Sequence, residues 1–154
     1  MKRRNILQVF LACAAIITTC AVPANAADIQ NEYICLENMA CELVDPSSLG
    51  CWESSIMPQA QGRIDETFPA HSLCPVDSSI SLKANDIVTF NCSYSPLSAS
   101  MDFGVITSSG RFYYINVKGG SINQAIRISH SGSYTVAIRN NSSQTVRVVG
   151  FVNY

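Results

Sequence analysis

Hydrophobic and polar residues alternate in short runs between residues 80 and 154. Every second residue from Val88 to Tyr94 is apolar, for example, as in a strand that buries one face and exposes the other. The pattern predicts seven strands, at residues 80–82, 87–94, 101–107, 112–117, 122–128, 134–139 and 145–153.

Turn-forming residues separate these runs. Gly, Asn and Ser fill the breaks, as at residues 118–120 and 140–143, and they tolerate the backbone conformations of tight turns. No amphipathic segment of helical length interrupts the runs, which argues against a parallel fold with crossover helices. We therefore expect an all-β protein, an antiparallel β-sandwich that is jelly-roll-like. The expected core residues are Leu82, Val88, Phe90, Tyr94, Phe103, Ile126, Ile128, Tyr134, Val136, Ile138, Val146 and Val148.

The segment at residues 27–77 has little periodicity and contains four prolines, which break regular structure. A short helix at residues 33–44 is weakened by the Cys and Asn at its centre, and one strand is expected around residues 63–68. We interpret this half as an irregular, cysteine-containing N-terminal arm. The β-sandwich core is expected to follow at residues 78–154.

The first 26 residues have the form of a secretory signal peptide. Three basic residues at positions 2–4 precede an apolar stretch at residues 6–22, and Ala24-Asn25-Ala26 follows it. Cleavage after Ala26 leaves a single domain and predicts a secreted, extracellular protein. Lipid attachment at Cys20 is the alternative, and a membrane anchor is disfavoured because the apolar stretch is short for a span.

Charge separates the two halves of the mature chain. Residues 27–77 carry nine acidic residues and one basic residue, whereas residues 78–154 carry two acidic and six basic residues. Either the basic half meets an anionic partner, such as a wall polymer or a sulfated glycan, or the acidic segment lies across it. The even spread of the six bases favours the second interpretation. With only 14% charged residues, a nucleic-acid binder is not expected, and no membrane contact is expected after cleavage.

Five cysteines remain after cleavage. Cys92 falls on the apolar face of a predicted strand and is interpreted as a buried thiol. Cys35, Cys41, Cys51 and Cys74 lie in the arm, where an oxidising exterior favours two disulfides with three open connectivities. Reduced thiols are the alternative. The wide spacing of the four does not match a zinc site, so no metal or other cofactor is expected.

The sequence contains no recognisable catalytic set. His71 and His130 are the only histidines, and nothing around a Cys74–His71 pair suggests an oxyanion hole. There is no Gly-x-Ser-x-Gly elbow, and the predicted sandwich offers only Asp86 and Asp102 as carboxylates. We therefore expect that the protein is not an enzyme.

Two aromatic residues are candidate ligand contacts. Neighbouring residues of a strand alternate, so Tyr113 points outward if Phe112 and Tyr114 point inward, or the reverse. An exposed tyrosine can stack on a sugar ring. Trp52, the only tryptophan, is the second candidate, although its place beside Cys51 favours packing against a disulfide.

Residues 80–154 resemble the small secreted β-sandwich proteins of Gram-positive, Clostridia-type gut bacteria. The matching stretches are Thr89-Phe-Asn-Cys-Ser-Tyr-Ser-Pro96, Ala99-Ser-Met-Asp-Phe-Gly104, Ser133-Tyr-Thr-Val-Ala-Ile-Arg-Asn-Asn-Ser142 and Gly150-Phe-Val-Asn-Tyr154. More distantly, the order of motifs is similar to jelly-roll modules of the bacterial pre-peptidase C-terminal type. These resemblances imply export, a fold and an accessory role, but no activity. Gly104 stands where such modules often carry a second acid after Asp102, which speaks against a calcium role.

These features predict a secreted, non-catalytic binding or adhesion module. Its expected partner is an extracellular glycan, a cell-wall polymer or a protein. The alternative is a secreted antagonist or inhibitor that acts on a protein target through the disulfide-pinned arm.

Overall fold

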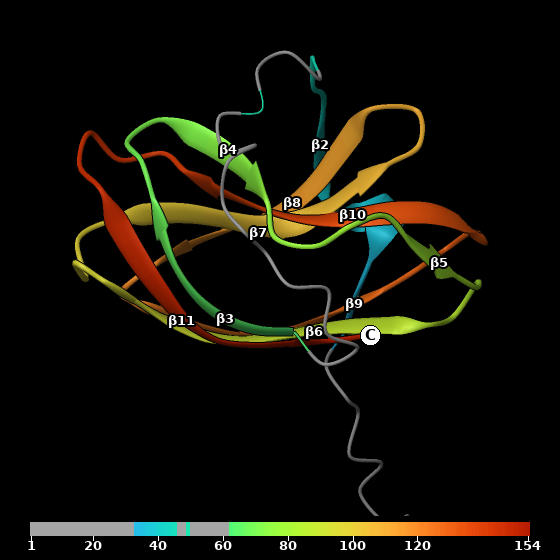
Figure 1. Cartoon of the computed structure of the whole chain (residues 1–154). Coiled ribbons are helices and arrows are strands. Elements are labelled where there is room, and N and C mark those ends of the chain that lie inside the picture. The colour runs from blue at the N-terminus through green and yellow to red at the C-terminus, as the bar shows by residue number, and fades with distance from the viewer. Residues whose placement is uncertain (1–32, 46–48, 50–61) are drawn as a thin grey trace, which may run out of the picture. The chain divides into compact units, whose positions relative to one another are not determined.

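Two β-sheets packed face to face make up the fold in the computed structural model, which describes residues 33–45, 49 and 62–154 (Figure 1). The elements are β1 (Tyr33–Cys35), the short 3-10 helix η1 (Leu36–Asn38), β2 (Ala40–Leu43), β3 (Gly62–Phe68), β4 (Ser72–Pro75), β5 (Ile80–Leu82), β6 (Ile87–Ser95), β7 (Ser100–Thr107), β8 (Arg111–Lys118), β9 (Ser121–Arg127), β10 (Gly132–Asn140) and β11 (Val146–Asn153). Sheet A has the order β1-β9-β6-β11-β3, and sheet B has the order β2-β8-β7-β10-β4, with β5 also paired to β10. The predicted all-β sandwich is confirmed. The predicted signal peptide, Cys20, Cys51 and Trp52 lie outside the described residues.

The strand pairs are nested along the chain. β7 pairs with β8, β6 with β9, β4 and β5 with β10, and β3 with β11, all antiparallel. The chain from β3 to β11 is therefore one long antiparallel ribbon, folded over so that β6 meets β11 and β7 meets β10. This is the strand order of a jelly roll. In Figure 1, β3, β6 and β11 lie in the lower layer, and β7, β8 and β10 lie in the upper one.

The core lies between the two sheets. All twelve residues expected there are 5% exposed or less, so this prediction is confirmed. The rings of Phe90 in sheet A and Phe103 in sheet B meet edge to face, with centroids 5.8 Å apart. All seven predicted strands are present, and the turn between β8 and β9 uses Gly119 and Gly120, both at positive φ.

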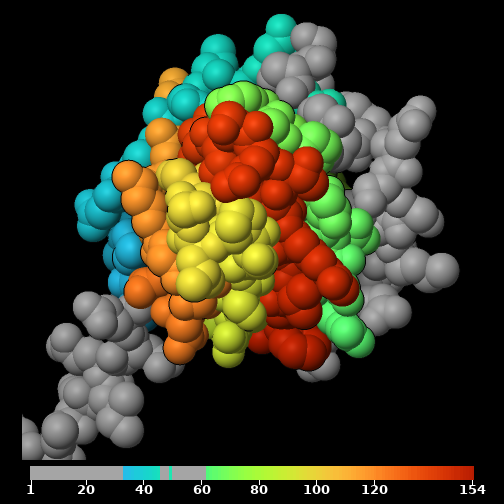
Figure 2. All heavy atoms as spheres, turned by 90° about the vertical axis from the view of Figure 1, so that its left-hand side faces the viewer, coloured from blue at the N-terminus to red at the C-terminus, as the bar shows by residue number. Residues whose placement is uncertain are grey.

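The described part of the expected arm is not irregular. Residues 33–45, which we call the N-terminal strap, run along one side of the sandwich: β1 pairs in parallel with β9, and β2 pairs antiparallel with β8. Figure 2 shows the blue and cyan atoms of the strap beside the orange atoms of β8 and β9. The sequence did not predict β1 and β2, and the short helix considered at residues 33–44 is wrong: only η1 is helical there, between two short strands in a segment of weak periodicity.

The sandwich also begins before residue 78. β3 matches the strand expected around residues 63–68 and forms the edge of sheet A, whereas β4, which was not predicted, pairs with β10 in sheet B. β4 ends in a proline, which is tolerated at a sheet edge.

Of the four cysteines expected to form disulfides in the arm, the prediction is wrong for Cys35 and Cys41 and confirmed for Cys74. Cys35 and Cys41 are free thiols. Cys35 ends β1 in sheet A, whereas Cys41 lies in β2 of sheet B. Cys74 is buried and disulfide-bonded. Cys92 is a free, buried thiol, as predicted.

Leu36 attaches the strap to the core, where it is 5% exposed. We expect Leu36→Ala to lower the free energy of unfolding by about 2–3 kcal/mol, because it removes buried apolar contacts. Leu43→Ala, in the same strap, is the matched control: Leu43 is 76% exposed, so a change below about 0.5 kcal/mol is expected. Urea denaturation followed by circular dichroism measures both, and equal effects would show that the strap does not pack on the core.

The cysteines should differ in reactivity. Burial raises the pKa of Cys92 to about 11, although its hydrogen bonds with the backbone of Phe151 and Asn91 oppose this. At pH 8 only about 0.1% of such a thiol is ionised, and the thiolate is the reactive form. Iodoacetamide should therefore modify the exposed Cys41 in the native protein and Cys92 only after unfolding in urea. Peptide mapping by mass spectrometry distinguishes the sites, and modification of native Cys92 at the rate of Cys41 would contradict the prediction.

Candidate functional site

The outer faces of the two sheets differ. In sheet A, β6 and β11 alternate between buried and exposed residues, as expected of a sheet with one face in water. In sheet B, β7 has five consecutive buried residues, and most of β10 is buried as well. Within the part of the chain that the structure describes, sheet B is therefore covered on both faces, and sheet A is open on its outer face.

A second hydrophobic cluster covers the outer face of sheet B. Its buried members are Val44, Leu73, Phe112 and Ala137, with Leu49, Ile106 and Tyr114 packed against them. Val44 directly follows β2, and Leu49 forms an isolated bridge with Leu73. Residues of the acidic half therefore lie on sheet B, in agreement with the interpretation that this half covers the rest of its own chain.

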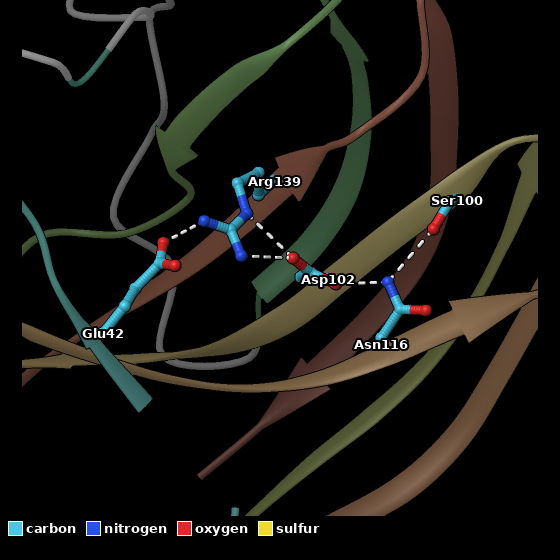
Figure 3. Close-up of polar contacts among 5 residues, drawn as sticks. All are labelled: Glu42, Ser100, Asp102, Asn116 and Arg139. Carbon is cyan, nitrogen blue, oxygen red and sulfur yellow. Dashed lines mark hydrogen bonds and ion pairs between the residues drawn. The ribbon is translucent and has the colours of Figure 1, made fainter. Parts of the chain in front are cut away.

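A charged cluster lies on the same covered face (Figure 3). Asp102 on β7 and Arg139 on β10 are partners in register, and Nε of Arg139 donates to Oδ2 of Asp102 at 2.8 Å. Nη1 of Arg139 donates to the carboxylate of Glu42 in the strap. Nδ2 of Asn116 donates to Oδ1 of Asp102 at 2.6 Å and to the hydroxyl of Ser100 at 3.0 Å. Asp102 is 1% exposed, so its buried charge is satisfied from both sides.

Two aromatic rings support the guanidinium of Arg139. Its Cζ lies 4.7 Å from the ring centroid of Tyr114 and 5.4 Å from that of Phe112. Burial alone would lower the pKa of Arg139, but Asp102 and Glu42 outweigh burial and raise it. Rings and carboxylates therefore enclose the cation. This arrangement fastens the strap to sheet B and leaves little of the cation for a ligand.

A hollow of about 700 Å³ lies where the strap meets the turn between β7 and β8. Its lining residues are Leu43, Val44, Asp45, Ile106, Thr107, Ser108, Ser109 and Gly110. The hydroxyls of Thr107 and Ser109 are 2.9 Å apart, and Thr107 also accepts from the backbone N–H of Arg111. Because these hydroxyls form hydrogen bonds within the turn, the hollow is a weaker candidate for a ligand site than the outer face of sheet A.

We call the outer face of sheet A the open face. Its outer positions on β3, β6, β9 and β11 are Arg63, Asp65, Thr67, Ile87, Thr89, Asn91, Ser93, Ser95, Ser121, Asn123, Ala125, Arg127, Arg147, Val149, Phe151 and Asn153. In the middle, Arg63, Phe151, Asn91 and Asn123 stand opposite one another on four adjacent strands. Three strand spacings, about 14 Å, separate the first from the last.

Phe151 is an apolar spot in this polar face. It is 52% exposed, and Val149 beside it on β11 is 36% exposed. The side-chain amides of Asn91 and Asn123 make no hydrogen bond to any other part of the described chain. An exposed ring next to free amides suits a ligand that combines apolar C–H faces with hydroxyl groups.

The two aromatic residues singled out from the sequence lie elsewhere. Tyr113 is half-buried and packs against the core, with Cys41 as its partner in register. Burial and the nearby Cys41 raise the pKa of Tyr113. Trp52 lies outside the described residues. Phe151 was not singled out, although alternation along β11 carries the signal: Val148 and Val152 point inward, so Phe151 points outward.

The candidate catalytic residues are not brought together. His71 and His130 are exposed, one beside β4 and one beside β10, whereas Cys74 is buried and disulfide-bonded. In the described ranges, no three or more His, Cys, Asp or Glu side chains gather as a metal site. No helix among these residues is long and apolar enough to cross a membrane.

Asp102 and Asp65 form a matched pair for testing the covered cluster. Asp102→Ala should lower the free energy of unfolding by about 3–5 kcal/mol, because it leaves Arg139 without its buried partner. Asp65 also pairs with an arginine, Arg147, at 2.7 Å, but both side chains are exposed to solvent, so Asp65→Ala should cost less than about 1 kcal/mol. Urea denaturation of both variants measures the difference, and equal costs would contradict a structural role for the cluster.

Comparison with known proteins identifies no relative: no family model matches the chain, and neither a curated protein nor a solved structure is significantly similar to it. The resemblance to small secreted β-sandwich proteins therefore stays a prediction, and the function is argued from the geometry of the two outer faces.

Proposed function

We propose that the protein is a secreted, non-catalytic binding module that holds an extracellular glycan or cell-wall polymer on its open face. The observation that carries the proposal is the row formed by Arg63, Phe151, Asn91 and Asn123. It combines an exposed aromatic ring with polar side chains on neighbouring strands, in a face that no described residue covers.

The chemistry of the row suits a sugar. A pyranose ring has an apolar C–H face that packs on an aromatic ring, and hydroxyls at its rim that exchange hydrogen bonds with amides. Asn91 is the register partner of Phe151, and Asn123 is the register partner of Asn91. A sugar stacked on Phe151 therefore lies beside two amides, each able both to donate and to accept. The length of the row, about 14 Å, accommodates more than one ring of a polymer.

The fold supports this use because it holds the face rigid. Phe151 lies on β11, between β3 and β6, and the neighbouring residue Val152 is buried in the core at 2% exposure. Side chains mounted on a central strand are positioned more accurately than side chains on loops. The alternative of an antagonist that acts through a disulfide-pinned arm is less favoured. Cys74 is disulfide-bonded, but Cys35 and Cys41 are free, and β1 and β2 of the strap pair with the two sheets.

Phe151→Ala tests the proposal. We expect it to weaken binding of a glycan or wall polymer at least about fivefold, because it removes the stacking surface. The fold should be unaffected, because half of the ring is already in water. A glycan and wall-polymer array identifies the ligand, and isothermal titration with the strongest hit gives the affinities.

Leu97→Ala is the matched control, since Leu97 is 69% exposed but lies between β6 and β7, away from the row. It should bind as the unchanged protein does. A wild-type protein that binds nothing on the array above background would count against the proposal, as would a Phe151→Ala variant of unchanged affinity.

A further inference from the structure

The open face carries more positive than negative charge. Arg63, Arg127 and Arg147 occupy outer positions of sheet A, and Asp65 is the only carboxylate among the outer positions of its described strands. Arg127 stacks on the ring of Tyr33, with Cζ 3.7 Å from the centroid. The remaining imbalance lies at the β3–β11 side of the face, next to Phe151.

Several other carboxylates of the described chain are engaged away from this face. Asp102 and Glu42 neutralise Arg139 on the covered face of sheet B. Asp77 accepts a hydrogen bond from the hydroxyl of Tyr154, and Asp86 accepts one from the backbone N–H of Lys83 at 2.7 Å. These four carboxylates therefore do not balance the arginines of the open face.

Arg63 and Arg147 share a single carboxylate. Nε and Nη2 of Arg147 donate to Oδ1 of Asp65 at 3.0 and 2.7 Å, and Nη2 of Arg63 lies 3.6 Å from Oδ2. The two arginine side chains are 65% and 64% exposed, so each keeps N–H donors directed to solvent. One carboxylate, that of Asp65, between two guanidiniums leaves a site with net positive charge, and the pairing with Asp65 shows that this site binds a carboxylate.

This site lies within reach of the stacking position. Arg63 is the register partner of Phe151, and Arg147 lies on the same face of β11, four residues before Phe151. A sugar that stacks on Phe151 therefore places the substituents of its ring, or of the next ring, beside a guanidinium. A carboxylate there would form a charge-assisted hydrogen bond, which a neutral hydroxymethyl group cannot.

We infer that the ligand of the open face is an acidic polysaccharide that carries carboxylates, such as a polymer of uronic acids. The inference rests on the proposed function, because it assigns a chemical class to the glycan that this face holds. Arg63 and Arg147 are its specificity-determining residues, and Phe151 supplies stacking that is common to acidic and neutral sugars.

The test compares matched polymers. Polygalacturonate and alginate are titrated against the mature protein, each beside its carboxyl-reduced form, which keeps the linkage and removes the charge. We expect at least about tenfold tighter binding of the acidic forms at low salt. This preference should shrink as sodium chloride is raised, because exposed charges are screened.

Variants separate the contributions. Arg63→Gln/Arg147→Gln should lose the preference while keeping the affinity for the reduced polymers. Lys83→Gln/Lys118→Gln removes the same charge from exposed residues off the open face and should keep the preference. Phe151→Ala should weaken binding of both forms alike.

Each other outcome is decisive. Equal binding of acidic and reduced polymers by the unchanged protein overturns the inference and leaves the proposed function standing. Equal loss of preference in the lysine variant overturns it as well, since net charge alone would then explain binding. If no uronate polymer binds, the inference fails, and the array decides the proposed function separately.

Discussion

Packing of one sheet against the other is the constraint on which the rest of the molecule depends. Phe90 and Phe103 meet edge to face at the centre, and the inner rows of β6, β7, β10 and β11 surround them almost without exposure to water. A strand that turns one row of side chains inward must turn the other row outward. The inner core therefore decides which residues form the two outer faces, including the outward position of Phe151.

The two outer faces differ in exposure because the N-terminal strap and Leu49 cover sheet B much more than sheet A. At sheet A the strap only adds β1 to an edge, whereas at sheet B it adds β2, places Glu42 on Arg139 and continues into a second hydrophobic cluster at Val44. The outer face of sheet B thus becomes a second interior. The outer face of sheet A remains a surface rich in hydroxyls and amides, and this asymmetry supports the proposal that sheet A is the side that meets a partner.

The sequence was informative wherever alternation runs over six or more residues. It predicted the long strands, the twelve core residues and the buried thiol Cys92, because an alternation of apolar and polar residues can be recognised over six or more positions. It failed where contacts are set by register between distant strands. Nothing in the sequence shows that Asp102 faces Arg139, or that Cys35 and Cys41 belong to different sheets. Phe151 lies between these cases, since its outward direction followed from its neighbours but the amides beside it required the strand order.

The two outer faces differ in charge balance because a buried arginine needs carboxylate partners, whereas an exposed arginine does not. A cation as enclosed as Arg139, which lies beside two rings, is stable only with carboxylates near it, and the fold supplies Asp102 from the neighbouring strand and Glu42 from the strap. Exposed arginines have no such requirement, because water solvates them at little cost. Arg63 and Arg147 therefore persist on sheet A with one acid between them. The excess of positive charge beside Phe151 is thus a local property of this face, in a chain whose formal net charge is −1.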